Sequence, residues 1–446
     1  MAKIKEPAVA DMFYPANAVK LKNMIETFAE NVNNPYEYKS RAVIVPHAGY
    51  VYSGELAYDG ISHLDTSIKT VFIFAPAHRV AFDGLALTTY DEWRTSLGCI
   101  RINKNVCKEL EKNFDAHFFD KGYSTEHSIE VQIPLIQTIL SDVNIVPVLV
   151  GRESPEAIRR IIEEYYPKPE FGFIISSDLS HHLPDDKAKM LDLETANMIE
   201  TGTTTNFRYE QACGALGIYG LMEFASSKGY SLIRINMYNS SLANNDKSSV
   251  VGYGAWMLYE GEKNKFIKEY YSDYLLGLAR EVIISKFSNN KLCTSHPPVM
   301  DELGACFVTL KINGNLRGCI GSIIAHQPFI KDFVQNALNA AFKDPRFNPL
   351  TRDEADEISI DVSILSDPKP MTFADEQDLI NQMVPGEDGI IIRDNGMQAV
   401  YLPCVWEEIP DKVMFLQSLK MKAGMLPNHF SKTFQAFRFR TEYIEE

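Results

Sequence analysis

The chain has 446 residues, of which 45% are hydrophobic and 23% are charged, and its formal net charge is −15. This length exceeds one ordinary core, so we expect two domains, and the acidic balance argues against a nucleic-acid binder that neutralises phosphates. No apolar run is long enough for a membrane-spanning helix, and the N-terminus lacks the apolar stretch of a secretory signal. Seven scattered cysteines without a CxxC pair favour the reducing cytoplasm.

The first half of the chain alternates strands with helices. In chain order, we expect a helix at 18–32, strands at 43–45, 71–75 and 84–90, helices at 105–113 and 128–140, a strand at 143–150, a helix ending near 166, a strand at 171–176, helices at 186–200 and 209–227, and strands at 231–238 and 249–258. This alternation predicts an α/β domain with a central, largely parallel or mixed sheet and helices on both faces.

A polar, charged segment at 260–266 predicts the boundary between two domains, 1–261 and 262–446. The second domain has a different pattern. In chain order, we expect a long helix at 267–287, a hairpin turning at Asn313-Gly314, a helix at 328–342, an alternating strand at 358–365, a hairpin around Asp394-Asn395-Gly396 and a helix ending near 423. These elements predict a mixed α+β fold.

Two histidines follow predicted strands of the first domain. An apolar strand at 43–45 stops at a proline and His47 comes next, and a strand at 71–75 stops at a proline two residues before His78. Proline ends the ladder of a central strand, and open α/β sheets bind ligands outside the carboxyl ends of their strands. We therefore expect the two imidazoles to converge on one site.

Further residues suited to metal or proton chemistry lie at predicted strand ends or helix starts. They are His127, Asp178, His181 and His182. Imidazole and carboxylate ligands suit iron, zinc or copper, and another histidine can serve as an acid or base near neutral pH. A single histidine at a strand end is commonly a hydrogen-bonded loop residue. Here two such histidines occur in one domain, and the segment SSDLSHH adds a carboxylate and two more histidines, so we favour a shared site.

Five segments resemble the Memo-like proteins, also called AmmeMemoRadiSam system protein B. They are FYPA at 13–16, VPHAGYVYSG at 45–54, EHSIEVQIP at 126–134, SSDLSHH at 176–182 and SSVVGYGAW at 248–256. The resemblance covers about residues 5–260 and implies a fold similar to the LigB-type extradiol dioxygenases. It also implies that His47 and His78 are metal ligands.

The same resemblance implies which residues surround the metal. Asp178 and His181 would line the pocket as catalytic residues, and His181 would match the acid/base histidine of the dioxygenase relatives. Phe13 matches an aromatic position at the pocket rim, and we assign Phe13 and His127 to substrate binding.

One ligand position departs from the family pattern. The third ligand of the family comes from the loop before the SSVVGY strand and is a cysteine in some members, but here Ala243 occupies that position. Asp246, Asn239 or Asp178 could replace it, or the position could be left to solvent. We expect a divalent metal, with iron first and zinc or copper as alternatives.

The motif LRGCIGS carries the chemistry of the second domain. Arg317 stands two residues before Cys319, and a neighbouring cation lowers the pKa of a thiol and raises its thiolate fraction. The alternative is a strand cysteine that packs as a small apolar residue. In DPRFNPL, Asp344 and Arg346 are candidate contacts for an anion or substrate, although the proline between them also ends the preceding helix.

These motifs resemble the AMME-candidate-region proteins, called AmmeMemoRadiSam system protein A in prokaryotes, over about 267–444. LRGCIG is unbroken, so the resemblance carries over to Arg317 and Cys319 directly, whereas Cys404 stands where relatives often have glutamine. The family name joins these two domains with a radical-SAM enzyme. Because the chain has no CxxxCxxC motif, we expect such a partner to be a separate polypeptide.

Together these features predict a cytoplasmic, two-domain, metal-dependent enzyme that acts on a small organic molecule. Cys319 would be a reactive cysteine of the second domain. The alternative is a non-catalytic Memo-like binding or scaffold protein, because the loss of a ligand at Ala243 would be typical of lost catalysis.

Overall fold

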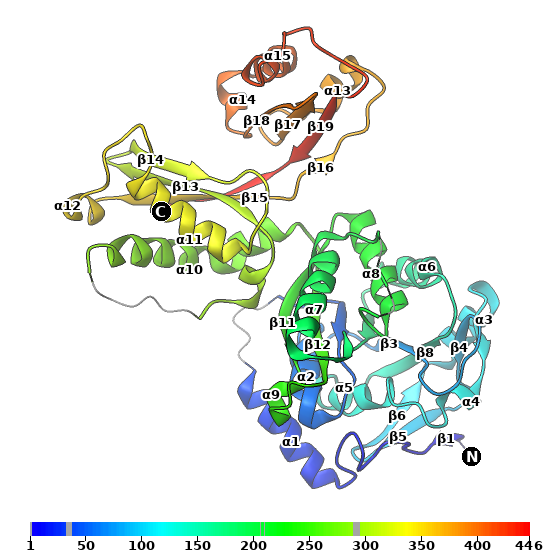
Figure 1. The fold of residues 1–446 in the computed structure, drawn as a ribbon. Coiled ribbons are helices and arrows are strands. Elements are labelled where there is room, and N and C mark those ends of the chain that lie inside the picture. Colours follow the sequence, from blue (N-terminus) through cyan, green and yellow to red (C-terminus); the bar gives the residue numbers. More distant parts are fainter. Residues whose placement is uncertain (1, 33–37, 206, 209, 289–294) are drawn as a thin grey trace. The chain divides into compact units, whose positions relative to one another are not determined.

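The structure is a computed structural model and describes residues 2–32, 38–205, 207–208, 210–288 and 295–446. The chain forms two compact units, Met1–Gly261 and Glu262–Glu446 (Figure 1). Within these described ranges, no helix combines the length and the apolar character needed to cross a membrane.

The first unit is a mixed sheet with helices on both faces. Its strands are β1 (Ile4–Lys5), β2 (Ala42–Val45), β3 (Thr70–Pro76), β4 (Leu85–Leu87), β5 (Glu92–Thr95), β6 (Gly98–Ile102), β7 (His117–Phe118), β8 (Asn144–Val150), β9 (Phe171–Ser176), β10 (His181–Leu183), β11 (Ser231–Asn239) and β12 (Val250–Tyr259). Its helices are α1 (Ala18–Asn31), α2 (Glu55–Ser62), α3 (Lys104–Asn113), α4 (Asp120–Tyr123), α5 (Ile133–Ile139), α6 (Pro155–Tyr165), α7 (Asp185–Thr201), α8 (Ala215–Lys228) and α9 (Ser241–Asn244), with a π-helical turn at Tyr50–Gly54 and a 3-10 turn at Glu130–Gln132. This architecture confirms the predicted α/β class.

The centre of this sheet is parallel. Among the described residues its strand order is β1-β5-β6-β8-β3-β9-β2-β12-β10, with β8, β3, β9 and β2 parallel and β12 antiparallel to β2. Every residue of β2 and β9 is buried. Strands covered on both faces need such continuous apolar runs, which explains why the sequence of these segments does not alternate.

Two helices cover opposite faces of the central strands. Val45 pairs with Ser176, so the side chain of Ile175, one residue earlier in β9, points to the other face. A Cβ on Gly217 of α8 would lie 2.9 Å from Ile175, and a Cβ on Gly60 of α2 would lie 2.4 Å from Val45. The two helices therefore approach the sheet from its two sides, as Figure 1 shows.

Helix α8 begins later than the sequence predicts, at Ala215. The residues before it are tied to the loop after β9 instead of continuing the helix. Cys213 N donates to Asp178 O at 3.2 Å, and Gly214 N donates to Ser177 Oγ at 2.9 Å. These contacts bring the start of α8 to the carboxyl ends of the central strands.

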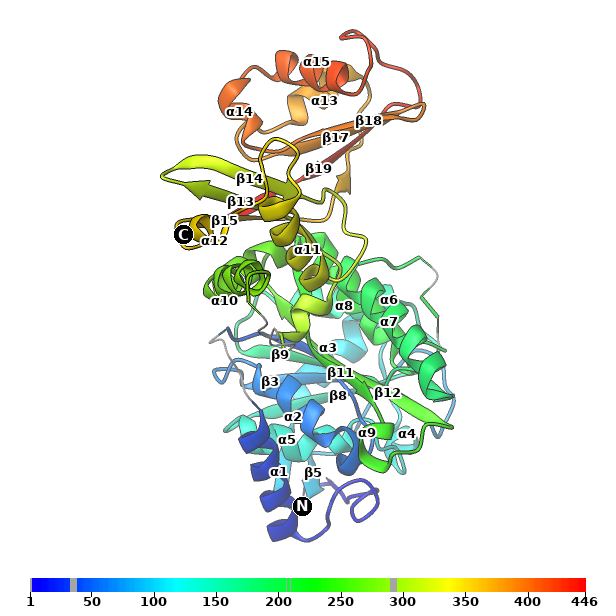
Figure 2. The same ribbon diagram turned by 60° about the vertical axis from the view of Figure 1, so that its left-hand side comes forward.

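The second unit contains two four-stranded sheets, β14-β13-β15-β20 and β16-β19-β17-β18. Its strands are β13 (Ala305–Ile312), β14 (Asn315–Gly321), β15 (Ser359–Leu365), β16 (Lys369–Pro370), β17 (Gly389–Asp394), β18 (Met397–Tyr401), β19 (Gln435–Phe439) and β20 (Thr441–Ile444). Its helices are α10 (Lys263–Ser285), α11 (Phe329–Phe342), α12 (Arg352–Ala355), α13 (Glu376–Gln382), α14 (Val405–Glu408) and α15 (Lys412–Lys422), with a 3-10 turn at Pro298–Asp301. Figure 2 shows α13, α14 and α15 gathered beside the β17-β18-β19 strands.

Both predicted hairpins of the second unit are confirmed. β13 and β14 pair around Asn313 and Gly314, whose φ angles are 51° and 76°. β17 and β18 pair around Asn395 and Gly396, whose φ angles are 47° and 82°. A two-residue hairpin turn of type I′ needs positive φ at both central positions, which Asn-Gly adopts with little strain.

Candidate metal centre

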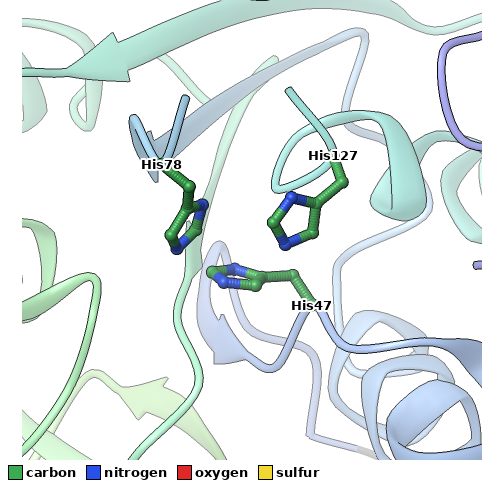
Figure 3. A group of neighbouring side chains, drawn as sticks. All are labelled: His47, His78 and His127. Carbon is green, nitrogen blue, oxygen red and sulfur yellow. The ribbon is translucent and has the colours of Figure 1, made fainter. Parts of the chain in front are cut away.

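Three histidine side chains meet beyond the carboxyl ends of β2 and β3 (Figure 3). His47 follows β2, His78 follows β3, and His127 precedes the 3-10 turn at Glu130–Gln132. Each offers one ring nitrogen, and these nitrogens lie within 4.8 Å of one another. The ring centroids are 5.1 Å apart for His47 and His78, 5.4 Å for His47 and His127, and 4.8 Å for His78 and His127.

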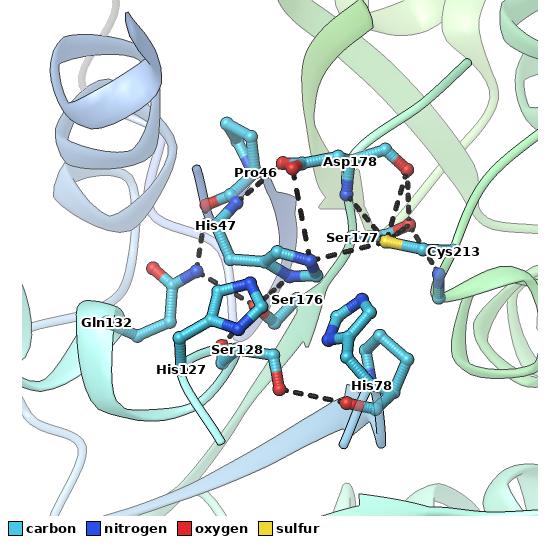
Figure 4. A network of polar contacts seen from close by, with 12 residues as sticks. Pro46, His47, His78, His127, Ser128, Gln132, Ser176, Ser177, Asp178 and Cys213 are labelled. Carbon is cyan, nitrogen blue, oxygen red and sulfur yellow. Dashed lines mark hydrogen bonds and ion pairs between the residues drawn. The ribbon is translucent and has the colours of Figure 1, made fainter. Parts of the chain in front are cut away.

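A buried hydrogen-bond network sets the tautomer of His47 (Figure 4). Its Nδ1 lies 2.9 Å from Ser176 Oγ, whose single proton is donated to Ser128 O at 2.7 Å. Ser176 Oγ also accepts from Gln132 Nε2 at 2.9 Å. Because the hydroxyl has no second proton to give, Nδ1 of His47 must be the donor. Nε2 of His47 therefore carries the lone pair, which is the form that binds a metal.

One carboxylate contacts both other histidines. Glu126 accepts from His78 N at 2.6 Å and from His127 N at 2.9 Å, and its Oε1 lies 3.0 Å from His78 Nδ1. Burial opposes its ionisation, but the hydrogen bonds from His127 and His78 outweigh burial and hold the pKa of Glu126 well below its usual range. A carboxylate on the far nitrogen of an imidazole is the arrangement that orients metal-binding histidines.

The donor set fits a metal ion. Burial, together with the charges of His78 and His127, lowers the pKa of His47 well below its ordinary value, so the ring is neutral. His127 Nδ1 is buried, lies 3.1 Å from Glu126 Oε1, and makes no hydrogen bond within the described part of the chain. A neutral His47 imidazole with the rings of His78 and His127 beside it forms a nitrogen donor set that suits a divalent transition metal. His127, expected in substrate binding, thus stands where a third ligand would.

The loop that was expected to supply the third ligand is engaged elsewhere. Ala243 lies in α9, Asn239 Nδ2 donates to Asp185 Oδ1 at 2.8 Å, and Asp246 Oδ1 accepts from Ser248 N at 2.9 Å. These hydrogen bonds close the loop on itself and on α7. The group of converging ligand atoms in the described residues is completed by His127 instead.

Asp178 is the buried carboxylate beside His47. Its Oδ1 accepts from His47 N at 2.8 Å, and its Oδ2 lies 4.0 Å from His47 Nε2. Burial raises the pKa of Asp178 to about 7, against the opposing effects of the His47 and Ala48 amides and of His78. A carboxyl with this pKa can hold or release a proton near neutral pH.

His181 lies close enough to the three histidines for its charge to lower the pKa of His47. It is the first residue of β10, where the pairing with β12 is irregular and His182 has a φ of 56°. Such bulges redirect side chains and are common beside active sites. Partial desolvation of the ring, with the charges of His182 and His78, lowers the pKa of His181.

A second buried carboxylate supports the loop that carries Asp178 and His181. Asp192 Oδ1 in α7 accepts from Ser180 N at 2.9 Å, and a Cβ on Gly252 would lie only 2.1 Å from Asp192 Oδ2. Burial raises the pKa of Asp192 to about 6, although the Ser180 hydrogen bonds act in the opposite direction.

We expect Asp192→Asn to stabilise the first unit at pH 8 and to change little at pH 4. The folded-state pKa of about 6 exceeds the ordinary 3.8, so the folded chain binds more protons in this window. The free energy of unfolding of the wild type therefore falls as pH rises through the window, and the neutral amide should recover about 3 kcal/mol above it. Hydrogen exchange of the slowest β9 amides at pH 4 and 8 measures the difference, and an equal effect at both pH values would contradict the assignment.

The Phe13 ring lies beside the His127 ring, with the two centroids 4.5 Å apart. Glu130 holds the segment that carries it. Glu130 accepts from Ala8 N at 2.8 Å and from Tyr14 Oη at 3.0 Å, and it forms a buried ion pair with Lys5 at 2.9 Å. The N-terminal segment is thereby fixed against the chain just after His127.

Cys213 is the functional candidate that the sequence reasoning missed. Its Sγ lies 3.2 Å from His47 Nε2 and accepts from Asp178 N at 3.3 Å. Burial and the charge of Asp178 raise the pKa of this thiol, and two acceptors lie near its proton, His47 Nε2 and, at 3.7 Å, Asp178 O. The neighbouring Gly214 allows this approach, because a Cβ there would lie 2.6 Å from Ser177, a contact that only the folded chain reveals.

In the second unit, Asp344 and Arg346 hold the main chain of Cys319. Cys319 N donates to Asp344 Oδ2 at 2.8 Å, Cys319 O accepts from Arg346 Nη2 at 3.2 Å, and the two side chains form an ion pair at 2.7 Å. The Asp344–Arg346 pair binds the edge strand β14 on the side that does not pair with β13. Its charged groups are thus used within the fold.

The side chains of Arg317 and Cys319 make their hydrogen bonds to different partners. Arg317 Nε and Nη2 bind Glu354 at 2.9 and 3.0 Å, because a carboxylate satisfies two guanidinium donors at once. Cys319 Sγ instead accepts from Thr309 Oγ1 at 3.2 Å. The reactivity of Cys319 stays a prediction.

Both halves of the chain match known proteins. The model of the Memo-like protein family matches residues 5–257, and that of AMMECR1 matches residues 276–444. A MEMO1 family protein of Sulfolobus acidocaldarius is 31% identical over 276 residues, covering 56% of this chain and 97% of the relative. A MEMO1 family protein of Thermoplasma volcanium is 32% identical over 269 residues, with the same two coverages of 56% and 97%.

Among solved structures, the crystal structure of an uncharacterized protein, PH0010 from Pyrococcus horikoshii, is 27% identical and covers 39% of this chain and 89% of that chain with a TM-score of 0.35. The family matches confirm both resemblances seen in the sequence. The chain belongs to the Memo-like protein family through residues 5–257 and joins to this part an AMMECR1 domain at residues 276–444.

Proposed function

We propose that the first unit is a metal-dependent enzyme in which His47, His78 and His127 hold one divalent transition metal ion, with iron expected first and zinc or copper as alternatives. The observation that carries the proposal is the convergence of three ring nitrogens within 4.8 Å. The Ser176 and Glu126 hydrogen bonds support it, because they orient His47 and His78 from behind. When bound, the ion would supply Lewis acidity or a redox centre.

The remaining residues would handle protons and the substrate. Asp178, with a pKa of about 7, would hold or release a proton beside His47. His181, which the family resemblance matches to an acid/base histidine, would exchange protons with a small organic substrate. Phe13 would close the site beside His127. The fused AMMECR1 domain would act on a related molecule, since fusion raises the concentration of each domain near the other.

The test is elemental analysis of the full chain purified without oxygen. We expect about one ion per chain in the wild type and a loss of at least tenfold in the His47→Ala, His78→Ala double variant, because one imidazole alone binds weakly. The exposed His326 offers a matched control, and His326→Ala should retain the ion. Full ion content in the double variant would contradict the proposed ligands, and a wild-type chain that holds no metal would favour a binding or scaffold protein.

A single variant separates the two roles considered for His127. If His127 is a ligand, His127→Ala should lower ion affinity by at least tenfold, as expected for losing one of three donors. Unchanged ion affinity with an altered response to substrate would return His127 to substrate binding.

A further inference from the structure

A pocket of about 450 Å³ opens beside the candidate metal centre. Three chain segments form it: the end of β3 with the loop at 77–82, the end of β8 at 150–152, and the start of α8 at 213–217. His78 and Cys213 both belong to its lining. The pocket therefore adjoins the site through one candidate ligand and through the thiol that contacts another.

The pocket wall is a fixed part of the fold. Arg152 N donates to Phe82 O at 3.0 Å, and Gly151 N donates to Gly84 O at 3.0 Å, so the loop after His78 is joined to the end of β8. A Cβ on Gly151 would lie 2.4 Å from Phe82 O. Only glycine permits this close approach, so the absence of a side chain at Gly151 is what lets the two segments pack directly against each other.

The chemistry of the lining is apolar. Its larger side chains are Phe74, Val80, Phe82, Val150 and Leu216. Among the described residues that line it, none is acidic, although the chain as a whole carries a charge of −15. The one charged lining side chain, Arg152, is exposed at the rim and pairs with Asp83 at 2.8 Å.

We infer that this pocket binds the apolar body of the substrate and presents its reacting end to His78. The inference rests on the proposed function and names its substrate class: a small, predominantly apolar organic molecule, as opposed to a sugar, a nucleotide or a phosphate ester. A sugar, a nucleotide or a phosphate ester would bury hydroxyl or phosphate oxygens against a wall with few hydrogen-bond donors. Buried polar groups without a partner oppose binding. Pockets of this size with an apolar wall and few polar groups are typical of small-molecule sites.

The experiment measures binding of two probes of similar size, indole and ribose, to the full chain by ligand-observed NMR. We expect saturable binding of indole and none of ribose. Ala81→Trp, at an exposed loop position in the lining, should fill the pocket and weaken indole binding at least tenfold. Leu216→Trp at the start of α8 is a second filling variant, and Met190→Trp on the exposed surface of α7 is the matched control that should bind indole as the wild type does.

Running both probes on ion-loaded and chelator-treated protein separates this inference from the proposed function. Indole binding that Ala81→Trp abolishes, in a chain that takes up no metal, would support the pocket and refute the metal site. Metal uptake with ribose binding, or with indole binding that neither filling variant weakens, would overturn the substrate class.

Discussion

Replacing Glu126 by glutamine should weaken metal binding at the three-histidine centre by roughly 10- to 100-fold. Glu126 is buried and contacts both His78 and His127, through their main-chain amides and through His78 Nδ1. Glutamine keeps one acceptor oxygen but turns an NH₂ group toward one of these donors and removes the negative charge. The imidazoles would then lose both their fixed orientation and the basicity that an ionised partner lends them. Competition titration against a chelator measures the affinity.

Two further variants make this test more specific, one with a shorter acidic side chain and one on the surface. Glu126→Asp keeps the charge but cannot reach both histidines, so we expect an affinity between those of the wild type and Glu126→Gln. Glu26→Gln changes the same group on the exposed side of α1, where its side chain is 57% exposed, and should leave affinity unaltered. If Glu126→Gln bound the metal as tightly as the wild type, the orienting role would have to be abandoned.

Glu130→Ala should lower the stability of the first unit by about 3–5 kcal/mol, because it leaves the Lys5 ammonium buried without its partner. The side chains of Lys5 and Glu130 are only 5% and 2% exposed, and the same carboxylate accepts from Ala8 N, Val9 N and Tyr14 Oη. All of these donors would be unsatisfied in the variant. Chemical denaturation measures the loss of stability.

The same variant should release the segment that carries Phe13. Hydrogen exchange at residues 5–14 should accelerate far more than at β9, since the lost contacts are confined to that segment. Combining Glu130→Leu with Lys5→Met removes both charges, and we expect it to destabilise less than Glu130→Ala, as replacing a whole buried pair is better tolerated than breaking it. Unchanged protection of residues 5–14 in Glu130→Ala would show that other contacts fix this segment.

The sequence by itself determined the features that depend on neighbouring residues. An apolar run that ends at a proline places His47 and His78 after β2 and β3, since the run is buried and neither strand extends beyond its proline. Two Asn-Gly pairs close hairpins for an equally local reason, namely the positive φ that both positions require. The motifs around these residues also identified both families, and the family matches confirm them.

Only the tertiary structure decided which distant groups meet at the site. Cys213 reaches His47 across 166 residues of chain, and His127 completes the group of ligand atoms, because the parallel order of β3, β9 and β2 brings their carboxyl ends together. Arg317 binds Glu354, a partner 37 residues further along the chain. A side chain selects its partner from every group that folding brings within reach, and the neighbouring sequence does not specify that set.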